Sequence, residues 1–155
     1  MLTRRCFHVM ALSLCVFPRH GVAQGDTVTI RIRADDRVRE LIPPILQQTL
    51  SIIPDNSPAA SELARRVPPG RAVPVIFMIA GALTVPVILQ MIQELLRQRY
   101  YGGVVIDTRA QPVNVTSDPR IPANMVFVIT SDGKTVEYTS SQIGADVLRS
   151  FLGKK

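Results

Sequence analysis

Acidic side chains are the main candidates for chemistry in this sequence, because both histidines and both cysteines lie within the first 20 residues. Asp35 and Asp36 are adjacent and could supply half of an acid/base pair or of a metal site, but such a pair is also typical of a helix cap. Asp107 could be a metal ligand or could form a surface ion pair with Arg109 or Arg120. The spacing of the acidic residues does not indicate that any two carboxylates converge on one site. We therefore predict no catalytic residue, no metal-binding residue and no enzyme.

Four other motifs have a structural explanation that needs no ligand. Gly102-Gly103 is typical of a hinge between helix and strand, since neither a GxGxxG pattern nor a lysine-bearing loop surrounds it. Tyr100-Tyr101 could stack on a ligand or anchor the chain at a membrane interface. Asn114-Val115-Thr116 fits the glycosylation acceptor pattern, and Asp118-Pro119 is typical of a turn. We therefore predict no cofactor-binding residue and no cofactor.

The N-terminus has the features of an export signal. The stretch TRRCF, residues 3–7, gives a basic start and resembles the twin-arginine motif Ser/Thr-Arg-Arg-x-Phe. A short apolar run at Val9–Phe17 and a small-residue cleavage site at Gly21-Val22-Ala23 follow. The run is too short to cross a bilayer as a helix, which takes about 20 residues. We predict that residues 1–23 are a twin-arginine or general secretory signal peptide, with export to the inner membrane or periplasm.

Two alternatives to a cleaved signal stay open. A lipoprotein signal could use Cys15, although Leu14 is not the small residue that such signals have before the cysteine. A wrongly assigned start codon or a frayed N-terminal helix would also account for the segment.

Cleavage after Ala23 would leave a chain without cysteine, histidine or tryptophan. Disulfides, thiolate nucleophiles, Cys/His zinc sites and imidazole bases are then excluded. The loss of three arginines lowers the formal net charge from +6 to +3. This charge is too small and too scattered to indicate nucleic acid as a partner. The remaining length, about 130 residues, allows one small domain or two very small ones.

Residues 24–71 are predicted to form one strand and several short helices. Thr27–Arg33 alternates between apolar and polar residues, which is the period of a half-buried strand. Pro43-Pro44 removes two backbone donors and should divide the helix that begins at Arg37. Ser57-Pro58 supplies the cap and the first-turn proline of a further helix. The remaining predicted elements are a helical piece at Ile45–Ile53, a helix end at Arg66 and a linker at Val67–Gly70.

The most informative stretch is AVPVIFMIAGALTVPVILQMIQ, residues 72–93, which contains no charged residue. As a helix rising about 1.5 Å per residue, it would be long enough to cross a hydrocarbon core of about 30 Å. Arginines and tyrosines at residues 97–101 resemble an interfacial belt. We therefore predict an apolar helix at residues 72–101 that spans the membrane. The alternative is a buried central helix of a soluble domain.

Residues 102–155 are predicted to form a small β-sheet domain with a C-terminal helix. Ser131-Asp132-Gly133-Lys134 supplies an Asp-Gly hairpin turn, in which glycine accepts the positive φ that the turn requires. Ser140 or Ser141 can cap a last helix that ends at Leu152. The strands of this domain are predicted at Val104–Asp107, Val113–Thr116, Met125–Thr130 and Thr135–Tyr138.

The chain is thus predicted to be α+β, with a small mixed or antiparallel sheet, flanking helices and one long apolar helix. This order of elements, with the degenerate motifs PPGRAVPV (residues 68–75) and SDGKTVEY (131–138), resembles the effector-associated constant components of bacterial conflict systems. The resemblance spans roughly residues 27–138. It implies a small membrane-linked adaptor that accompanies effector domains and has no catalytic residues of its own.

The leading hypothesis for function is a non-enzymatic, membrane-anchored interaction or adaptor protein, accessory to a bacterial conflict system. Membrane lipid and a second protein would be its partners, and the protein partner could add a strand to an exposed edge of the sheet. The alternative is a soluble exported binding module whose core helix is the apolar segment. A hydrolase that works only with carboxylates is a third and less supported class.

Overall fold

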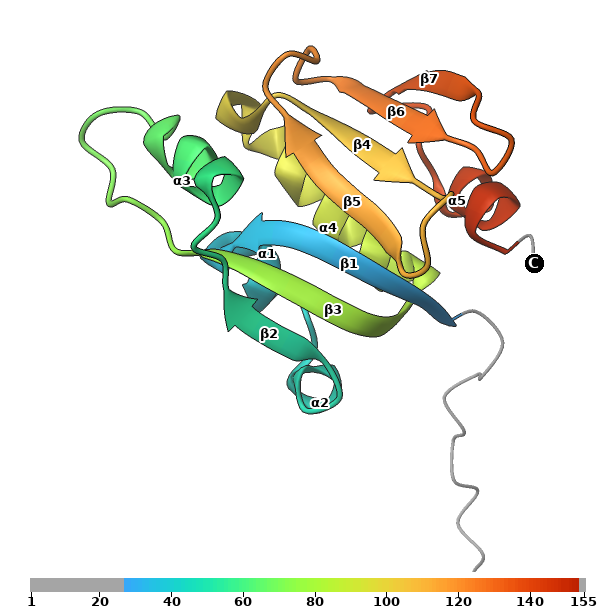
Figure 1. The fold of residues 1–155 in the computed structure, drawn as a ribbon, viewed down its shortest axis with the longest axis horizontal. Coiled ribbons are helices and arrows are strands. Elements are labelled where there is room, and N and C mark those ends of the chain that lie inside the picture. The colour runs from blue at the N-terminus through green and yellow to red at the C-terminus, as the bar shows by residue number, and fades with distance from the viewer. Residues whose placement is uncertain (1–26, 154–155) are drawn as a thin grey trace, which may run out of the picture.

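A seven-stranded mixed sheet runs through residues 27–153, the part of the chain that the computed structural model describes. The strands are β1 (Thr27–Asp35), β2 (Ser51–Pro54), β3 (Ile76–Thr84), β4 (Gly103–Asp107), β5 (Val113–Asp118), β6 (Met125–Ile129) and β7 (Thr135–Thr139). They lie in the order β2-β3-β1-β5-β4-β6-β7 (Figure 1). The pairs β1/β5 and β4/β6 are parallel, and the other neighbours are antiparallel. The fold is therefore α+β with a mixed sheet.

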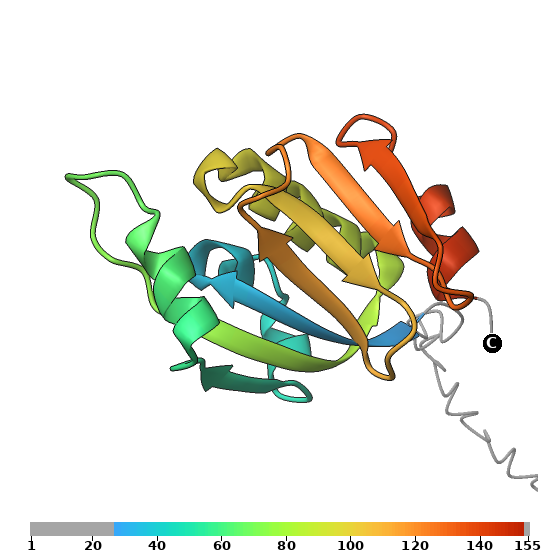
Figure 2. The same cartoon turned by 45° about the horizontal axis from the view of Figure 1, so that its top comes forward.

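The helices are α1 (Asp36–Glu40), α2 (Pro44–Gln47), α3 (Pro58–Arg65), α4 (Val85–Arg97) and α5 (Ala145–Leu152), with a 3₁₀ turn, η1, at Arg99–Tyr101. Helix α4 crosses behind the strands in Figure 1, and both α1 and α5 pack against it. Figure 2 shows α3 beside the end of β1 and the start of β3, on the other side of the sheet from α4.

The core lies between the sheet and α4. Ile30 and Ile32 of β1 are fully buried, as the strict alternation of this strand predicts. On α4, the apolar face that meets them includes Ile88 and Ile92, which are also fully buried. Each such side chain contributes about 1.5–3 kcal/mol by leaving water.

The prediction of one long apolar helix spanning the membrane at residues 72–101 is wrong. The segment divides into the strand β3 and the 13-residue helix α4. Pro86 lies in the first turn of α4, where a missing N–H costs nothing, so the proline begins the helix instead of interrupting it. β3 lies between β2 and β1 in the sheet, which explains its apolar composition without a bilayer. Within residues 27–153, no helix combines the length and the hydropathy that crossing a membrane requires.

Local signals place the N-terminal helices as the sequence predicts. The Asp35 carboxylate accepts a hydrogen bond from the Val38 N–H and caps α1. Pro43-Pro44 separates α1 from α2. The Ser57 hydroxyl accepts from the Ala60 N–H, with Pro58 as the first residue of α3.

Two predicted boundaries differ because tertiary contacts compete with local propensity. The second half of the helical piece predicted at Ile45–Ile53 instead belongs to β2, which pairs with β3. The last helix begins at Ala145 rather than after Ser140 or Ser141, since Gln142 donates its N–H to the Thr139 carbonyl and extends a turn there. The predicted signal peptide, residues 1–23, lies outside the described residues.

An ion pair joins β1 to the segment after β2. The Arg33 Nε donates to Asp55 Oδ2 at 2.6 Å, and the Ser57 N–H donates to Asp55 Oδ1 at 2.9 Å. Burial alone would raise the pKa of Asp55, but the hydrogen bonds from Arg33 and Ser57 outweigh it and hold the pKa below its ordinary value. The stabilisation from this pair is therefore present above the unfolded-state pKa, about 3.9, and is lost as the pH falls through the lower folded-state pKa.

We expect Asp55→Asn to lower the free energy of unfolding by about 2 kcal/mol at neutral pH, because it removes charge-assisted hydrogen bonds from a mostly buried pair. Denaturant unfolding at neutral pH and at about pH 3 checks this, since the variant should lose less stability on acidification than the unmodified chain. Equal acid losses in the two proteins would contradict the prediction.

Candidate functional site

The two edges of the sheet, β2 and β7, are the places where another strand could be added. On β7, the hydrogen bonds just beyond the strand fix the direction of its backbone groups: the Thr130 N–H donates to the Lys134 carbonyl, and the Ser140 N–H donates to the Asn124 carbonyl. Because antiparallel pairs alternate between bonded and non-bonded positions, every second residue of β7 points its N–H and C=O away from β6. These outward residues are Thr135, Glu137 and Thr139.

At one of the three outward positions, Thr139, the backbone groups are already hydrogen-bonded within the protein. The Thr139 N–H donates to Gln142 Oε1, and the Thr139 carbonyl accepts from the Gln142 N–H, both at 2.9 Å. Within residues 27–153, no partner is present for the outward backbone groups of Thr135 and Glu137, and both residues are exposed. We call the N–H and C=O groups of Thr135 and Glu137 the β7 edge.

The opposite edge offers fewer backbone groups. The Asp55 N–H donates to the Ile76 carbonyl, so by the same alternation Ile52 and Pro54 point outward. Pro54 has no N–H to donate, which leaves Ile52 as the outward donor of β2. Proline on an edge strand commonly protects it from pairing. The β7 edge is therefore the more open of the two.

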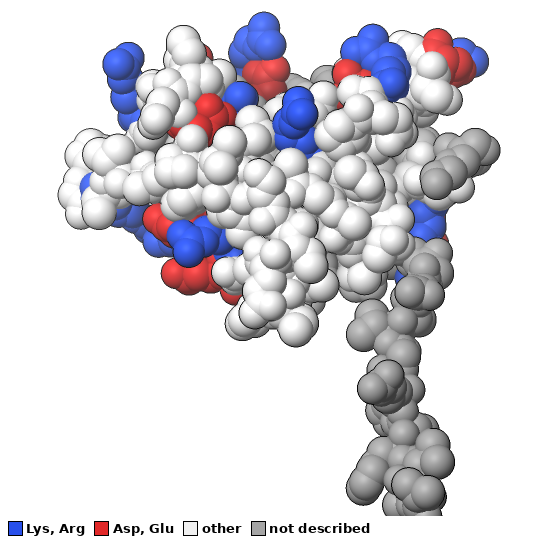
Figure 3. Space-filling view, turned by 60° about the horizontal axis from the view of Figure 1, so that its bottom comes forward, with Lys and Arg blue, Asp and Glu red and all other residues white. Residues whose placement is uncertain are grey.

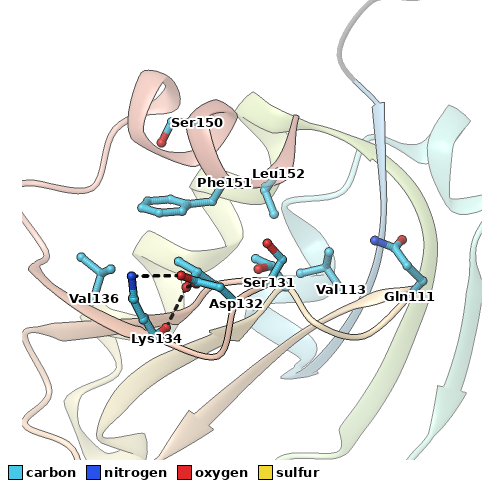
Figure 4. Close-up of a pocket in the computed structure, with 11 residues that line it drawn as sticks. Gln111, Val113, Ser131, Asp132, Lys134, Val136, Ser150, Phe151 and Leu152 are labelled. Atoms are coloured by element: carbon cyan, nitrogen blue, oxygen red, sulfur yellow. Dashed lines mark hydrogen bonds and ion pairs between the residues drawn. The ribbon is translucent and has the colours of Figure 1, made fainter. Parts of the chain in front are cut away.

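A pocket of about 460 Å³ lies at the end of the sheet next to the β7 edge. It is bounded by the ends of β4 and β6, the turn between β6 and β7 and the last turn of α5 (Figure 4). Its polar lining is Thr108, Gln111, Thr130, Ser131, Asp132, Lys134 and Ser150, and its apolar lining is Val113, Val136, Phe151 and Leu152.

The polar side of the pocket is held in place by the β6–β7 turn. The Thr130 hydroxyl hydrogen-bonds to the Asp132 carboxylate and to the Lys134 carbonyl, and Lys134 Nζ lies 3.3 Å from Asp132 Oδ2. These contacts hold the pKa of Asp132 below its ordinary value. Gly133 takes the positive φ of +84° that this turn needs. On the neighbouring strand, the Thr108 hydroxyl donates to the Ile129 carbonyl at 2.8 Å.

This arrangement suits binding rather than acid/base catalysis. The Asp132 carboxyl remains ionised well below neutral pH, so it has no proton to exchange near pH 7. Phe151 and Leu152 face the polar turn from α5 (Figure 4). The pocket can therefore hold a group that is apolar on the helix side and polar on the turn side.

The adjacent carboxylates of the sequence analysis do not act together. Asp35 is 2% exposed and accepts hydrogen bonds from the Tyr101 hydroxyl at 3.1 Å and from Gln98 Nε2 at 3.3 Å. Burial and the neighbouring Asp35 raise the pKa of Tyr101 well above its ordinary value. Asp36 lies on the surface, 3.6 Å from Arg39. The capping hypothesis accounts for Asp35, but its contacts with Gln98 and Tyr101, more than 60 positions away, have no local signal in the sequence.

The other candidate acids form local ion pairs. Asp107 pairs with Arg109 at 2.7 Å, and Asp118 pairs with Arg120 at 2.8 Å. In each case the hydrogen bonds from the arginine hold the pKa of the aspartate below its ordinary value. In the described range, no three His, Cys, Asp or Glu residues are grouped so that they could hold a metal ion.

The remaining motifs occupy structural positions. Tyr100 and Tyr101 contact each other edge to face, with ring centroids 4.4 Å apart, and Tyr101 is buried beneath the surface. Gly102-Gly103 joins η1 to β4. Asn114 lies within β5 and is half-buried.

A broad surface with few charges covers the side of the molecule that carries α2 and β2. Figure 3 turns this side toward the viewer and shows mostly uncharged atoms in its centre. Leu41–Pro54 contains no charged residue, and Ile45 and Ile53 are 71% and 57% exposed. An anionic bilayer would attract Lys and Arg, which Leu41–Pro54 lacks. Association with lipid stays a prediction.

The pocket was not predicted from the sequence, although two features of the sequence mark residues that line it. Thr108 and Thr130 each follow directly after a strand, and the Asp-Gly turn lies between two further strands. Parallel pairing of β4 with β6 brings these positions to the same end of the sheet, and single-sequence patterns do not reveal that pairing.

Comparison with protein-family models, curated proteins and solved structures finds no match to this chain.

Proposed function

We propose that this chain is a non-enzymatic interaction module that binds an extended segment of a partner protein along the β7 edge. The observation that supports this proposal is the pair of open backbone positions, Thr135 and Glu137, beside the pocket. In strand addition, main-chain hydrogen bonds supply affinity, and pockets for alternate side chains supply specificity. Val136, which lines the pocket, lies between the two open positions.

The pocket favours a partner segment with an apolar side chain that also carries or adjoins a polar group. Phe151 and Leu152 provide the apolar wall, while Lys134 and Asp132 provide one positive and one negative group. A nucleic acid would require a basic stripe instead. The proposal also includes export through residues 1–23 and a role as an adaptor in a conflict system. These two parts rest on the sequence and not on the described residues.

The test is selection from a displayed library of random octapeptides, followed by affinity measurement on variants of the β7 edge. Glu137→Pro removes an outward N–H without removing a bond between β6 and β7, because the Glu137 N–H points away from β6. We expect this variant to bind the selected peptides about tenfold more weakly, the equivalent of about one charge-neutral hydrogen bond. Glu137→Ala keeps the N–H and should bind like the unmodified protein.

Hydrogen exchange supplies a second measurement on the same complex. In the free protein, the amides of Thr135 and Glu137 should exchange quickly, whereas those of Val136 and Tyr138, which face β6, should be protected. Peptide binding should protect Thr135 and Glu137. Equal peptide affinity of Glu137→Pro and Glu137→Ala, with both variants melting cooperatively, would contradict the proposal, as would selection of no peptide.

A further inference from the structure

A second cavity, of about 530 Å³, lies at the far end of β1, away from the β7 edge. The first turn of α1, the segment before β3 and η1 form its walls. Its lining residues are Asp35, Asp36, Arg37, Val67, Arg71, Ala72, Val73, Pro74 and Tyr100. We call it the α1 cavity.

The charged residues that line the α1 cavity differ in whether they have partners within the protein. Within residues 27–153, Arg37 and Arg71 have no ion pair or hydrogen bond from their guanidinium groups. The carboxylates are engaged: Asp36 pairs with Arg39, and Asp35 accepts three hydrogen bonds within the protein. The charged groups of the cavity that have no partner within the described residues are therefore the two guanidinium groups, while the half-exposed Asp36 keeps its carboxylate next to Arg39.

The distribution of the other arginines makes this pair informative. Seven of the twelve arginines in the described range pair with an acidic side chain. Of the five that do not, Arg37 and Arg71 line the α1 cavity together, whereas Arg31, Arg65 and Arg99 lie outside it. Guanidinium groups bind carboxylate and phosphate through parallel N–H bonds. Two unpaired guanidinium groups on one cavity therefore indicate an oxyanion ligand.

The rest of the α1 cavity is apolar. Val73 is 74% exposed, which is unusual for a valine, and Val67 and Pro74 line the wall beside it. The ring of Tyr100 is held by its hydroxyl, which donates to Gln98 Oε1 at 3.3 Å, and by its contact with Tyr101. A ligand with a short hydrocarbon part could cover this surface.

We propose that the α1 cavity binds a small organic oxyanion, a carboxylate or a phosphate monoester with a short hydrocarbon chain. Arg37 and Arg71 bind the anionic group, and Val73 and Tyr100 contact the hydrocarbon part. The cavity lies on different elements from the β7 edge, so this inference does not depend on the proposed partner segment.

Titration calorimetry of the full chain tests the proposal with four probes: hexanoate, hexyl phosphate, hexanamide and acetate. Hexanoate or hexyl phosphate should bind more tightly than both hexanamide, which lacks the charge, and acetate, which lacks the chain. The tighter of the two anions identifies the class of anionic group. Binding should weaken as salt is added, because the contact is partly exposed.

Variants locate the binding. Arg37→Gln and Arg71→Gln should each weaken binding of the better anion by about tenfold, as expected for the loss of a hydrogen bond to a charged group. Arg65→Gln is the matched control, since Arg65 is also exposed and unpaired within the described range but lies outside the α1 cavity. Equal binding of hexanoate and hexanamide, no binding of any probe, or equal effects of the three substitutions would overturn the proposal.

Discussion

Replacing Asp35 with alanine is expected to lower the free energy of unfolding by about 3–5 kcal/mol. The substitution removes the cap of α1 and leaves two buried donors, the Tyr101 hydroxyl and Gln98 Nε2, without this acceptor. The Tyr101 hydroxyl left unsatisfied costs about 1–3 kcal/mol, and the lost cap costs about 1 kcal/mol. Gln98 Nε2 keeps Glu94 Oε1 as an acceptor, so the loss of its bond to Asp35 adds about 1 kcal/mol. Equilibrium unfolding in urea measures the sum.

Asp36→Ala is the matched control for this experiment. Asp36 has the same side chain one position later, but it is about half exposed and contacts Arg39 at 3.6 Å. Exposed pairs contribute less than about 1 kcal/mol. The loss of unfolding free energy in Tyr101→Phe should fall between those of the two alanine variants, because this substitution removes one hydrogen-bond donor to Asp35 and keeps the cap. Similar losses for Asp35→Ala and Asp36→Ala would show that the Asp35 hydrogen bonds do not stabilise the fold.

Gly102→Ala is expected to destabilise the protein by about 4 kcal/mol, the sum of backbone strain and overpacking. Gly102 has φ +81° and ψ −153°, a region that essentially only glycine occupies. An added Cβ would lie 2.3 Å from the Asp118 carbonyl oxygen and 2.5 Å from the Pro119 Cα. Both atoms belong to the backbone, so they cannot move aside as the end of a flexible side chain would. Thermal and urea unfolding measure the loss.

Gly133→Ala is a comparison variant with a positive φ and no close contact. Gly133 has nearly the same φ, +84°, but a Cβ there would meet nothing within 4 Å. The stability lost by Gly133→Ala should therefore come from backbone strain alone and amount to about 1–2 kcal/mol. If the two alanine variants lost the same stability, the close approach of Gly102 to the Asp118–Pro119 turn would not be a source of destabilisation.

These two predictions concern the end of the sheet that carries the α1 cavity. Asp35 ends β1, and Gly102 precedes β4, so the buried hydrogen bonds and the tight turn fix neighbouring strand ends. Tyr100, which lines the cavity, follows Gln98 and adjoins Tyr101.

Elements with local signals could be predicted from the sequence. The alternation at Thr27–Arg33, the cap and proline at Ser57-Pro58 and the Asp-Gly turn each act within a few residues, so the chain adopts the predicted structure wherever these segments lie. The strands predicted after residue 102 lie close to β4, β5, β6 and β7 for the same reason.

The structure of the uncharged segment at residues 72–93 depends on contacts with distant parts of the chain. Its apolar run is compatible with a membrane helix, a buried helix or a buried strand, because a continuous apolar run has no period that separates them. Pairing of β3 with both β1 and β2 made its first half a strand, and packing against the sheet made its second half the helix α4. The free groups of the β7 edge, the pocket beside it and the α1 cavity likewise arise from contacts between residues far apart in the chain, and no local pattern records those contacts.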